Sequence, residues 1–352
     1  MRVVVVGASG NVGTSVLHAL AADPAVESIL GISRRRPAMT WPKTDWAEAD
    51  IAGDDDLGAL FRGADAVVHL GWLIQPSRDE ATLYATNVDG SQRVFNAVAR
   101  AGVPALVYSS SVGAYSPGPK DRAVDESWPT SGIATSFYSR HKAAVERLLD
   151  SFEREHPELR VVRLRPGLIF KREAATEIRR YFAGPFVPSP LVRRGLIPVV
   201  PEVDRLVFQA VHSLDVGDAF RRAVVNGDAR GAYNVAAAPV LDPDELARVL
   251  GARKVRMPSR LLRAGADLTW KLRLQPTPKG WVDMGLGVPV MDTTRVRREL
   301  GWKETFSAGE ALLDLIGGMR DRSGADTPPL APASSGPLRV REFLTGVGRT
   351  SK

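Results

Sequence analysis

The sequence predicts an α/β protein with a doubly wound parallel sheet and a smaller, discontinuous C-terminal lobe. Three observations predict this fold: an apolar run at residues 2–6, a glycine-rich turn directly after it, and alternating strand-like and helix-like segments up to about residue 165. A strand buried on both faces of a parallel sheet has such a continuous apolar run. Strands that alternate with helices imply right-handed crossovers, which build a doubly wound sheet.

The predicted elements follow in order along the chain. Apolar residues between Val12 and Leu20 recur at helical spacing, so the first helix begins within the glycine-rich turn. Further strands are expected at residues 28–32, 66–70, 105–109 and 160–164, and helices at residues 81–100 and from about residue 137. The core domain is therefore expected to span residues 1–165.

The regular alternation ends after residue 165. Residues 166–201 are rich in proline, arginine and phenylalanine, which predicts insertions that form a pocket. We expect a substrate lobe over residues 166–320, with segments near residues 206–240 returning to the core. Residues 321–352 are expected to form a flexible linker and a basic tail, because residues 323–337 are mainly Pro, Ser, Gly and Ala.

Composition excludes several classes of protein. The chain has no cysteine, which excludes disulfides and thiolate chemistry, and its five histidines stand at no metal-ligand spacing, so no metal site is expected. The apolar run at residues 3–6 is too short for a signal peptide or a membrane span, which favours a cytoplasmic protein. The net charge of +7 is spread without an aromatic-interleaved motif, so no nucleic-acid partner is expected.

One basic segment, residues 259–281, also carries leucines and tryptophans. It could touch a membrane or a partner protein, but an ordinary helix of the lobe is the better interpretation. No stable membrane insertion is expected.

The glycine-rich turn has the pattern G-x-x-G-x-x-G, formed by Gly7, Gly10 and Gly13. Without side chains, the first two glycines allow a tight turn and close approach of a pyrophosphate to a helix N-terminus, as in a Rossmann fold. The spacing differs from the G-x-G-x-x-G of many dehydrogenases. The residues between the glycines that we assign to the cofactor are Ser9, Asn11 and Val12.

The residues that follow the second strand favour NADP over NAD. NAD sites place an acidic residue about twenty positions after the glycine motif, whereas this chain has Ser33, Arg34 and Arg35 there. Arginine matches the 2′-phosphate of NADP, with the Ser33 hydroxyl nearby. A basic surface loop is the other interpretation, so NAD remains possible.

Tyr138 and Lys142 lie four residues apart and share one face of the predicted helix. A lysine charge close to the phenol is expected to lower the pKa of Tyr138 towards the range of general acid and base chemistry. Because such spacing also occurs by chance, the pair has meaning only beside a cofactor site.

Further motifs occur in order along the chain. They are Asp50-Ile51, His69-Leu70-Gly71, Asn87-Val88-Asp89-Gly90, Ser109-Ser110-Ser111, Arg165-Pro166-Gly167, residues 211–216 and Leu300-Gly301-Trp302. Together with the glycine turn and the Tyr138–Lys142 pair, they resemble the extended short-chain dehydrogenase/reductase family, also called the NAD-dependent epimerase/dehydratase family. The resemblance covers residues 1 to about 306.

The resemblance implies roles for individual residues. Ser111, Tyr138 and Lys142 would be catalytic, and Tyr138 and Lys142 would also contact the cofactor. The other residues that it assigns to cofactor binding are Asp50, Ile51, Leu70, Gly71, Asn87, Ser109, Pro166 and Gly167. His141 is expected to be a solvated helix residue, and a homodimer is possible by resemblance alone.

Two departures from the family pattern narrow the range of expected substrates. Sugar-nucleotide dehydratases carry Asp-Glu after the catalytic threonine, whereas Val112 and Gly113 follow Ser111 here. Epimerases usually have an arginine at the position of Phe208, although Arg205 could substitute for it.

The expected substrate pocket is largely apolar. It includes Trp72, with Leu73 and Ile74 beside it, and Phe182 and Phe186 of the irregular segment. The same residues could be ordinary lobe packing. The arginines at positions 179, 180, 193 and 194 keep an anionic substrate possible.

The leading hypothesis is an oxidoreductase, preferring NADP, that interconverts a carbonyl and an alcohol on a small, largely apolar molecule. The alternative is a nucleotide-sugar epimerase with tightly bound NAD. A third hypothesis, a nonenzymatic NADP-sensing regulator, is weaker because Ser111, Tyr138 and Lys142 are all retained.

Overall fold

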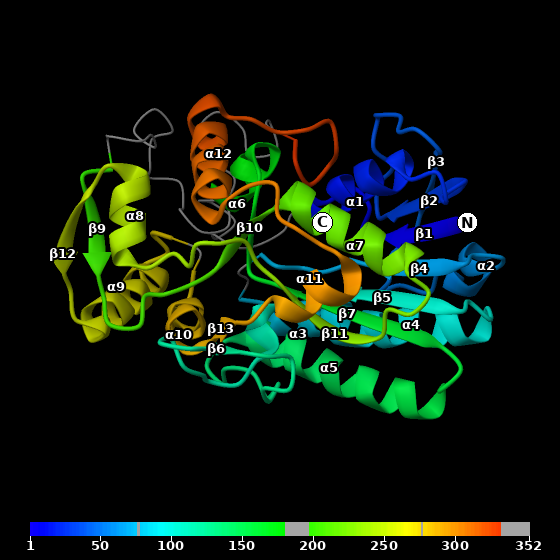
Figure 1. Cartoon of the computed structure of the whole chain (residues 1–352), viewed down its shortest axis with the longest axis horizontal. Helices are drawn as coiled ribbons and strands as arrows, with labels where there is room; N and C mark the ends of the chain where they lie inside the picture. Colours follow the sequence, from blue (N-terminus) through cyan, green and yellow to red (C-terminus); the bar gives the residue numbers. More distant parts are fainter. Residues whose placement is uncertain (76–77, 180–196, 276, 332–352) are drawn as a thin grey trace.

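Seven parallel strands form the central sheet, and their order confirms the predicted doubly wound architecture. The computed structural model of the chain describes residues 1–75, 78–179, 197–275 and 277–331. Within these residues the sheet order is β11-β7-β5-β4-β1-β2-β3, and every neighbouring pair is parallel (Figure 1). The strands of this sheet are β1 (Arg2–Val6), β2 (Ser28–Ser33), β3 (Thr44–Glu48), β4 (Ala66–His69), β5 (Ala105–Ser109), β7 (Arg160–Pro166) and β11 (Gly231–Val235).

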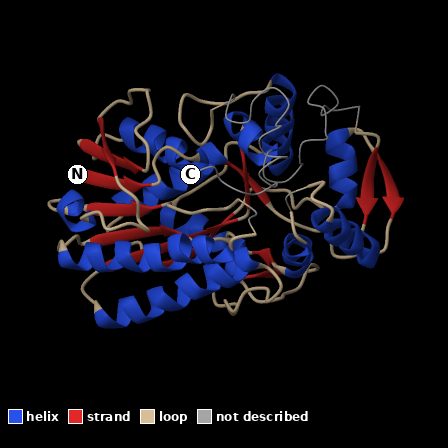
Figure 2. Cartoon of the chain, turned by 180° about the vertical axis from the view of Figure 1, so that it is seen from behind, coloured by secondary structure: helices blue, strands red, loops and turns tan. Residues whose placement is uncertain are grey.

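Helices cover both faces of this sheet, and three short strand pairs lie outside it (Figure 2). The helices are α1 (Asn11–Ala22), α2 (Leu57–Phe61), α3 (Glu80–Tyr84), α4 (Gly90–Arg100), α5 (Phe137–Glu155), α6 (Ala175–Ile178), α7 (Ser213–Val225), α8 (Pro243–Leu250), α9 (Ser259–Lys271), α10 (Lys279–Gly287), α11 (Thr294–Leu300) and α12 (Ala308–Asp321). The short strands are β6 (Ala123–Val124), β8 (Leu168–Phe170), β9 (Val199–Glu202), β10 (Ala210–His212), β12 (Arg253–Arg256) and β13 (Val290–Met291). The π-helical turn η1 (Ala85–Asp89) joins α3 to α4, and η2 (Val112–Ala114) and η3 (Arg172–Ala174) are 3₁₀ turns.

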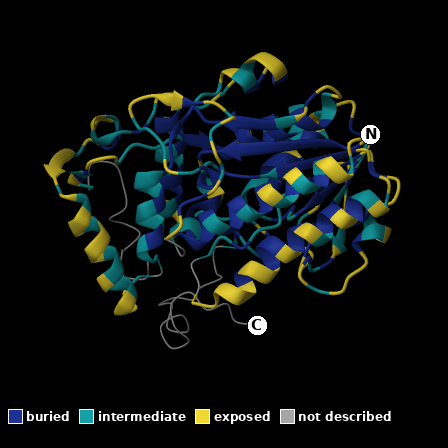
Figure 3. Cartoon of the chain, turned by 90° about the horizontal axis from the view of Figure 1, so that it is seen from below, coloured by how far each residue is buried: buried dark blue, intermediate teal, exposed yellow. Residues whose placement is uncertain are grey.

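Strand β1 shows why the first apolar run is continuous. Val3 and Val5 pack with α1 and α7 on one face of the sheet, while Val4 and Val6 pack with α2, α4 and α5 on the other. Because side chains alternate across a strand, every position of a strand covered on both faces must be apolar. The buried residues accordingly gather in the sheet and on the helix sides that face it (Figure 3).

The smaller lobe is built from separate C-terminal segments. It contains the parallel pair β9–β12, with α8 and α9 beside it, at the end of the molecule farthest from the N-terminus (Figure 1). Its own core includes Val200, Leu241, Leu246 and Leu250. Between lobe segments the chain returns to the core, where α7 packs on α1 and β11 forms an edge of the sheet.

Residues 323–331 differ from the predicted flexible linker. Leu330 is buried, and its N–H donates to the carbonyl of Thr327, which is also buried. This turn packs against the molecule because Leu330 offers an apolar anchor within an otherwise polar segment. The predicted basic tail, residues 332–352, lies outside the described residues.

No helix among the described residues is long and apolar enough to cross a bilayer. In the same part of the chain, no group of three or more His, Cys, Asp or Glu side chains is placed to hold a metal ion.

Candidate active site

A cavity of about 810 Å³ opens at the carboxyl ends of the central strands. This is where open α/β sheets bind their ligands. The residues assigned to the cofactor from the sequence that line it are Gly7, Ser9, Gly10, Asn11, Val12, Gly13, Ser33, Arg34, Arg35, Asp50, Ile51, Leu70, Gly71, Ser109, Tyr138, Lys142, Pro166 and Gly167. The sheet therefore brings together side chains and backbone groups from six strand ends.

The three glycines of the turn are required for different reasons. Gly7 has φ of +83°, a conformation that favours glycine, and a Cβ there would lie 2.8 Å from the Gly71 nitrogen. A Cβ on Gly13 would overlap the carbonyl oxygen of Gly7. Gly10 differs, because a Cβ there would meet only the Gly7 oxygen at 3.6 Å, an ordinary contact. The protein itself does not require glycine at position 10, but a ligand that approaches the backbone would.

The first turn of α1 fits a dinucleotide pyrophosphate. Gly10 is its N-cap and no side chain caps its N–H groups. The buried Oδ1 of Asn11 has no hydrogen-bond partner among the described residues. Uncapped N–H groups at the positive end of a helix are suited to an anion.

Arg34 and Arg35 lie exposed at the rim of the cavity beyond β2. Neither guanidinium forms an ion pair within the described part of the chain. The Ser33 hydroxyl donates to the Arg35 carbonyl at 2.8 Å and so shapes this turn. Two guanidinium groups are therefore available to a ligand that extends from the first turn of α1 to this rim.

Asn87 does not line the cavity. Its side chain is fully buried, where its Oδ1 accepts from the Leu73 N–H at 2.7 Å and its Nδ2 donates to the Leu73 carbonyl at 3.0 Å. The residue therefore holds the segment that follows β4, and its expected place in the cofactor shell stays a prediction. The π-helical turn around Asn87 directs its side chain towards this segment.

Ser111 and Tyr138 meet at the centre of the cavity. Ser111 lies directly after β5, and its Oγ accepts from the Gly113 N–H at 3.0 Å. Tyr138 lies in the first turn of α5, a helix whose N-cap is Ser136. The Ser111 hydroxyl is close enough to the Tyr138 phenol to favour its ionised form, and both residues line the cavity. A carbonyl or hydroxyl oxygen of a substrate could be held between them.

Lys142 points away from the Tyr138 hydroxyl. Its Nζ donates to the Ser109 carbonyl at 2.7 Å and to the Tyr108 hydroxyl at 3.3 Å. It also lies 3.6 Å from the centre of the Trp72 ring but 6.0 Å from that of Tyr138. The helical spacing places Lys142 on the same face of α5 as Tyr138, as expected. Its hydrogen bonds, however, direct the ammonium group towards β5.

The expected lowering of the Tyr138 pKa is therefore wrong for this structure. Burial raises the pKa of Tyr138 to about 12, and the hydrogen bond with Ser111 offsets only part of this rise. Burial also holds the pKa of Lys142 well below its ordinary value, with the charge of Glu146 opposing this change.

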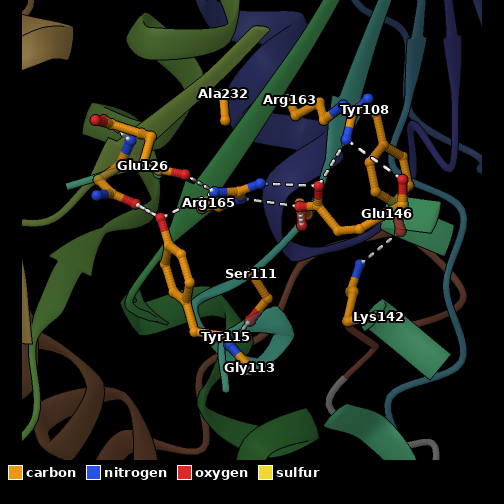
Figure 4. A network of polar contacts seen from close by, with 12 residues as sticks. Tyr108, Ser111, Gly113, Tyr115, Glu126, Lys142, Glu146, Arg163, Arg165 and Ala232 are labelled. Carbon is orange, nitrogen blue, oxygen red and sulfur yellow. Dashed lines mark hydrogen bonds and ion pairs between the residues drawn. The ribbon is translucent and has the colours of Figure 1, made fainter. Parts of the chain in front are cut away.

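A buried ionic network joins α5 to β7 and to the end of β5 (Figure 4). Glu146 lies one turn after Lys142 and binds Arg165 through both carboxylate oxygens, each at 2.9 Å. Arg163 adds a third contact at 2.9 Å, and the Ser110 hydroxyl donates to Glu146 at 2.5 Å. Burial alone would raise the pKa of Glu146, but the hydrogen bonds and charges of the two arginines lower it to about 2. The network fixes α5 against β5 and β7.

Apolar side chains line the remainder of the cavity. Trp72 forms an edge contact with Tyr138, at 5.9 Å between ring centres, and Trp281 lies against the same ring at 5.1 Å. Other residues of this wall are Leu73, Ile74, Leu206, Phe208, Leu262, Met284, Leu286 and Val288. The sequence did not assign to the pocket Trp281 and Met284 of α10, or Leu206, Leu262, Leu286 and Val288. The three-residue spacing of Trp281 and Met284 gives no signal that distinguishes a pocket wall from ordinary core.

Arg205 and His141 both differ from the expectations based on the sequence. Arg205 does not replace the missing arginine, because its guanidinium donates to the backbone carbonyls of Leu286 and Gly118 and does not line the cavity. His141 is buried and not solvated, because its ring packs against Tyr84 and Phe137.

Several residues assigned to the pocket cannot be placed. Phe182, Phe186 and the arginines at positions 180, 193 and 194 lie outside the described residues.

Comparisons with known proteins agree with this fold and site. The sequence profile of the NAD dependent epimerase/dehydratase family matches residues 3–236. The fold and the cavity define a dinucleotide-binding enzyme of the Rossmann type. The chain belongs to the NAD dependent epimerase/dehydratase family, whose profile covers most of its length.

Individual relatives are distant. An uncharacterised protein of Mycobacterium tuberculosis is 27% identical over 326 residues, which cover 92% of this chain but 31% of that protein. The chain thus spans about a third of the length of that relative. An L-arabinose 1-dehydrogenase (NAD(P)(+)) of Haloferax volcanii is 34% identical over 110 residues, 31% of this chain and 41% of that enzyme.

Among solved structures, a UDP-glucose-4-epimerase of Stenotrophomonas maltophila, with bound NAD and formylated UDP-arabinopyranose, superposes with a TM-score of 0.67. Its sequence is 20% identical, and the match covers 91% of this chain and 98% of that one. A likeness at this identity establishes the shared fold and leaves the substrate open.

Proposed function

We propose that the protein is an oxidoreductase, preferring NADP, that interconverts a carbonyl and an alcohol on a small, largely apolar molecule. One observation carries the proposal: Ser111 and Tyr138 line the same cavity as the glycine turn, and the Tyr138 ring lies against Trp72 and Trp281. A polar pair beside an apolar wall is suited to one reacting oxygen on an otherwise apolar substrate.

Each side chain has a defined task in this proposal. Ser111 donates a hydrogen bond to the substrate oxygen, and the Tyr138 phenol gives up its proton to that oxygen during reduction or receives it during oxidation. Trp72 and Trp281 flank the phenol and exclude water from it. The nicotinamide cofactor supplies or accepts the hydride when bound. Lys142 holds the end of β5 through the Ser109 carbonyl.

Arg34 and Arg35 support the preference for NADP. No carboxylate pairs with either guanidinium in the described chain, and Ser33 shapes the turn that presents them. Both would bind a 2′-phosphate through charge-assisted hydrogen bonds. Replacing both by serine is expected to weaken NADPH binding by about 30-fold and to leave NADH binding nearly unchanged. Fluorescence titration with both cofactors measures this, and equal losses for the two would argue against the assignment.

The direct test is turnover of NADPH with a panel of apolar ketones and aldehydes, followed at the nicotinamide absorbance. Tyr138→Phe is expected to lower kcat by about 10²–10⁴-fold, since it removes the transferable proton. Tyr84→Phe, which removes the hydroxyl of an exposed tyrosine on α3, is the matched control and should retain full activity. Unchanged turnover in Tyr138→Phe would refute the mechanism.

A nucleotide-sugar epimerase is the second candidate, favoured by the fold it shares with the epimerase described above. It predicts NAD retained through purification and turnover without net change in the oxidation state of the cofactor. Phe208 and the engaged Arg205 weigh against it, because no guanidinium there remains for a sugar diphosphate. Cofactor binding without turnover of any carbonyl or sugar nucleotide would instead favour a regulator.

A further inference from the structure

The outermost helix of the smaller lobe presents a line of leucines to solvent. No residue of α9 is buried. Leu261, Leu268 and Leu272 are exposed by 59%, 58% and 58%, and at 100° per residue they fall within about 40° of one another around the helix. Gly265 lies on the same line, with open space around it. We refer to Leu261, Gly265, Leu268 and Leu272 as the leucine stripe.

Contacts on the inner side of α9 fix the direction of the stripe. The Arg78 guanidinium stacks over the Trp270 ring at 4.0 Å and donates to the Trp270 carbonyl at 2.6 Å. Arg263 forms an ion pair at 2.7 Å with Asp283 of α10. Leu262 lines the cavity. The helix is therefore held on its inner side, and the leucine stripe is exposed to solvent. Helix α9 itself belongs to the lobe at the end of the molecule farthest from the N-terminus (Figure 1).

The segment that carries the stripe is strongly basic, although four of its cations pair with the carboxylates of Glu202, Asp244, Asp267 and Asp283. Residues 251–275 contain seven lysines and arginines and one acid, a net charge of +6, against +7 for the whole chain. All four residues of β12 are exposed, and three of them are basic. Arg253, Arg260 and Arg273 form no ion pair with any described carboxylate. An exposed apolar line is thus bordered by uncompensated cations.

We propose that the leucine stripe docks onto the surface of an anionic lipid bilayer. An interfacial helix of this kind buries its apolar face at the level of the head groups, while basic side chains bind anionic lipids. A second copy of the chain is a poor occupant, because a two-fold contact through this surface would bring together Arg253, Arg260 and Arg273 of the two copies, which are unpaired within the described chain. The docking proposal does not depend on the reaction proposed above.

Docking at this surface would also place the cavity close to the bilayer. Leu262, about a quarter turn around α9 from the stripe, is part of the cavity wall. The lipid surface and this part of the cavity wall would then lie within about 10 Å of each other, the thickness of one helix. Apolar carbonyl compounds concentrate in the lipid phase, so the position suits the substrate class of the proposed function.

The test is sedimentation of the purified full chain with vesicles of phosphatidylcholine alone and of phosphatidylcholine mixed with phosphatidylserine. We expect binding to the mixed vesicles that weakens at high salt. The triple variant Leu261→Ser, Leu268→Ser, Leu272→Ser should bind them at least about tenfold more weakly. Leu214→Ser, at an exposed leucine of α7, is the matched control and should bind like the wild type.

A charge variant keeps the proposal testable if the triple serine variant is poorly folded. Replacing Arg253, Arg260 and Arg273 by glutamine should lower binding to the mixed vesicles by about tenfold or more, without changing the melting temperature. Equal sedimentation with and without vesicles would overturn the proposal, as would full binding by both variants. Light scattering that shows a dimer converted to monomers by the serine variant would assign the stripe to a second copy, and would overturn it too.

Discussion

The part of the cavity beside α1 is lined by backbone and short polar side chains, whereas the part beyond Tyr138 is lined by large apolar ones. The first comes from residues at or just after the ends of the core strands, such as Gly7, Ser33 and Gly71. The second depends on Trp281 and Met284 of α10, more than 140 residues after Tyr138. Tyr138 and Ser111 lie at the boundary between these two halves.

This difference shows how one fold can keep its cofactor and change its substrate. In the cofactor half, an added methyl group can overlap backbone atoms, as at Gly13, and the closely packed backbone cannot move to make room for it. In the substrate half, side chains pack against side chains, which tolerate exchange for others of similar volume. Substitutions in the cofactor half should therefore affect protein stability and cofactor binding. Substitutions in the substrate half should mainly change substrate specificity.

The largest expected effect concerns the phenol at the boundary. Because burial raises the pKa of Tyr138 to about 12, the phenol stays protonated near neutral pH. Carbonyl reduction, which uses the proton, should depend little on pH in this range. Alcohol oxidation needs the phenolate, so its rate should rise up to about tenfold per pH unit over the whole range below the pKa. Initial rates in both directions from neutral to alkaline pH test this.

A plateau of the oxidation rate close to neutral pH would contradict it. Such a plateau would mean that a positive charge near the phenol, from Lys142 or the bound cofactor, outweighs the desolvation caused by the apolar half. Tyr138→Phe serves as the control that identifies the titrating group.

Two glycines of one turn provide the next test. Gly13→Ala is expected to lower the free energy of unfolding by about 2–3 kcal/mol, because the added methyl overlaps the backbone of Gly7 and Ala8. Gly10→Ala should change it by less than about 1 kcal/mol, since the methyl has room. It should nevertheless weaken NADPH binding by about tenfold, because the methyl occupies the path of the pyrophosphate. Urea unfolding and cofactor titration measure the two quantities.

If Gly10→Ala binds NADPH like the wild type, the pyrophosphate does not approach α1 as proposed. If Gly13→Ala is as stable as the wild type, the turn is more deformable than its packing indicates.

In the substrate half, Trp281→Leu should raise KM for apolar carbonyl substrates by about tenfold, because it removes contact area from the pocket wall. Cofactor affinity should stay the same. Trp270→Leu is the matched control, since Trp270 belongs to the lobe but does not line the cavity. A parallel loss of cofactor affinity in Trp281→Leu would show that the two halves are not independent.

The contrast between the halves also explains what could be predicted from the sequence. Buried strands and the glycine turn are encoded by contiguous residues, so the sheet and most of the cofactor half could be predicted from local patterns. Trp281 reaches Tyr138 only through the packing of α10, which no local pattern specifies. The direction of Lys142 and the inward turn of Asn87 depend on carbonyl groups of distant segments, and spacing along one helix cannot reveal them.

The smallest effect concerns a buried cation beneath the cofactor half. Lys171 is nearly inaccessible to solvent, and its Nζ donates to the Asn11 carbonyl at 2.7 Å and to the Thr14 hydroxyl at 2.6 Å, at the start of α1. Burial lowers the pKa of Lys171 to about 8, although Glu173 and Glu177 oppose this change. The unfolded chain, with an ordinary lysine pKa of about 10.4, binds the proton more tightly than the folded protein.

Between these two pKa values the unfolded state therefore carries more bound protons, so stability rises with pH. We expect the free energy of unfolding of the wild type to increase by up to about 1 kcal/mol per pH unit from pH 8 to 10 relative to Lys171→Met, which lacks this group. Urea unfolding of both proteins at several pH values gives the difference directly, and titrations shared by the two cancel. If the free energies of unfolding of the two proteins change in parallel with pH, water reaches Lys171. The lysine would then be less buried beneath α1 than its hydrogen bonds to Asn11 and Thr14 indicate.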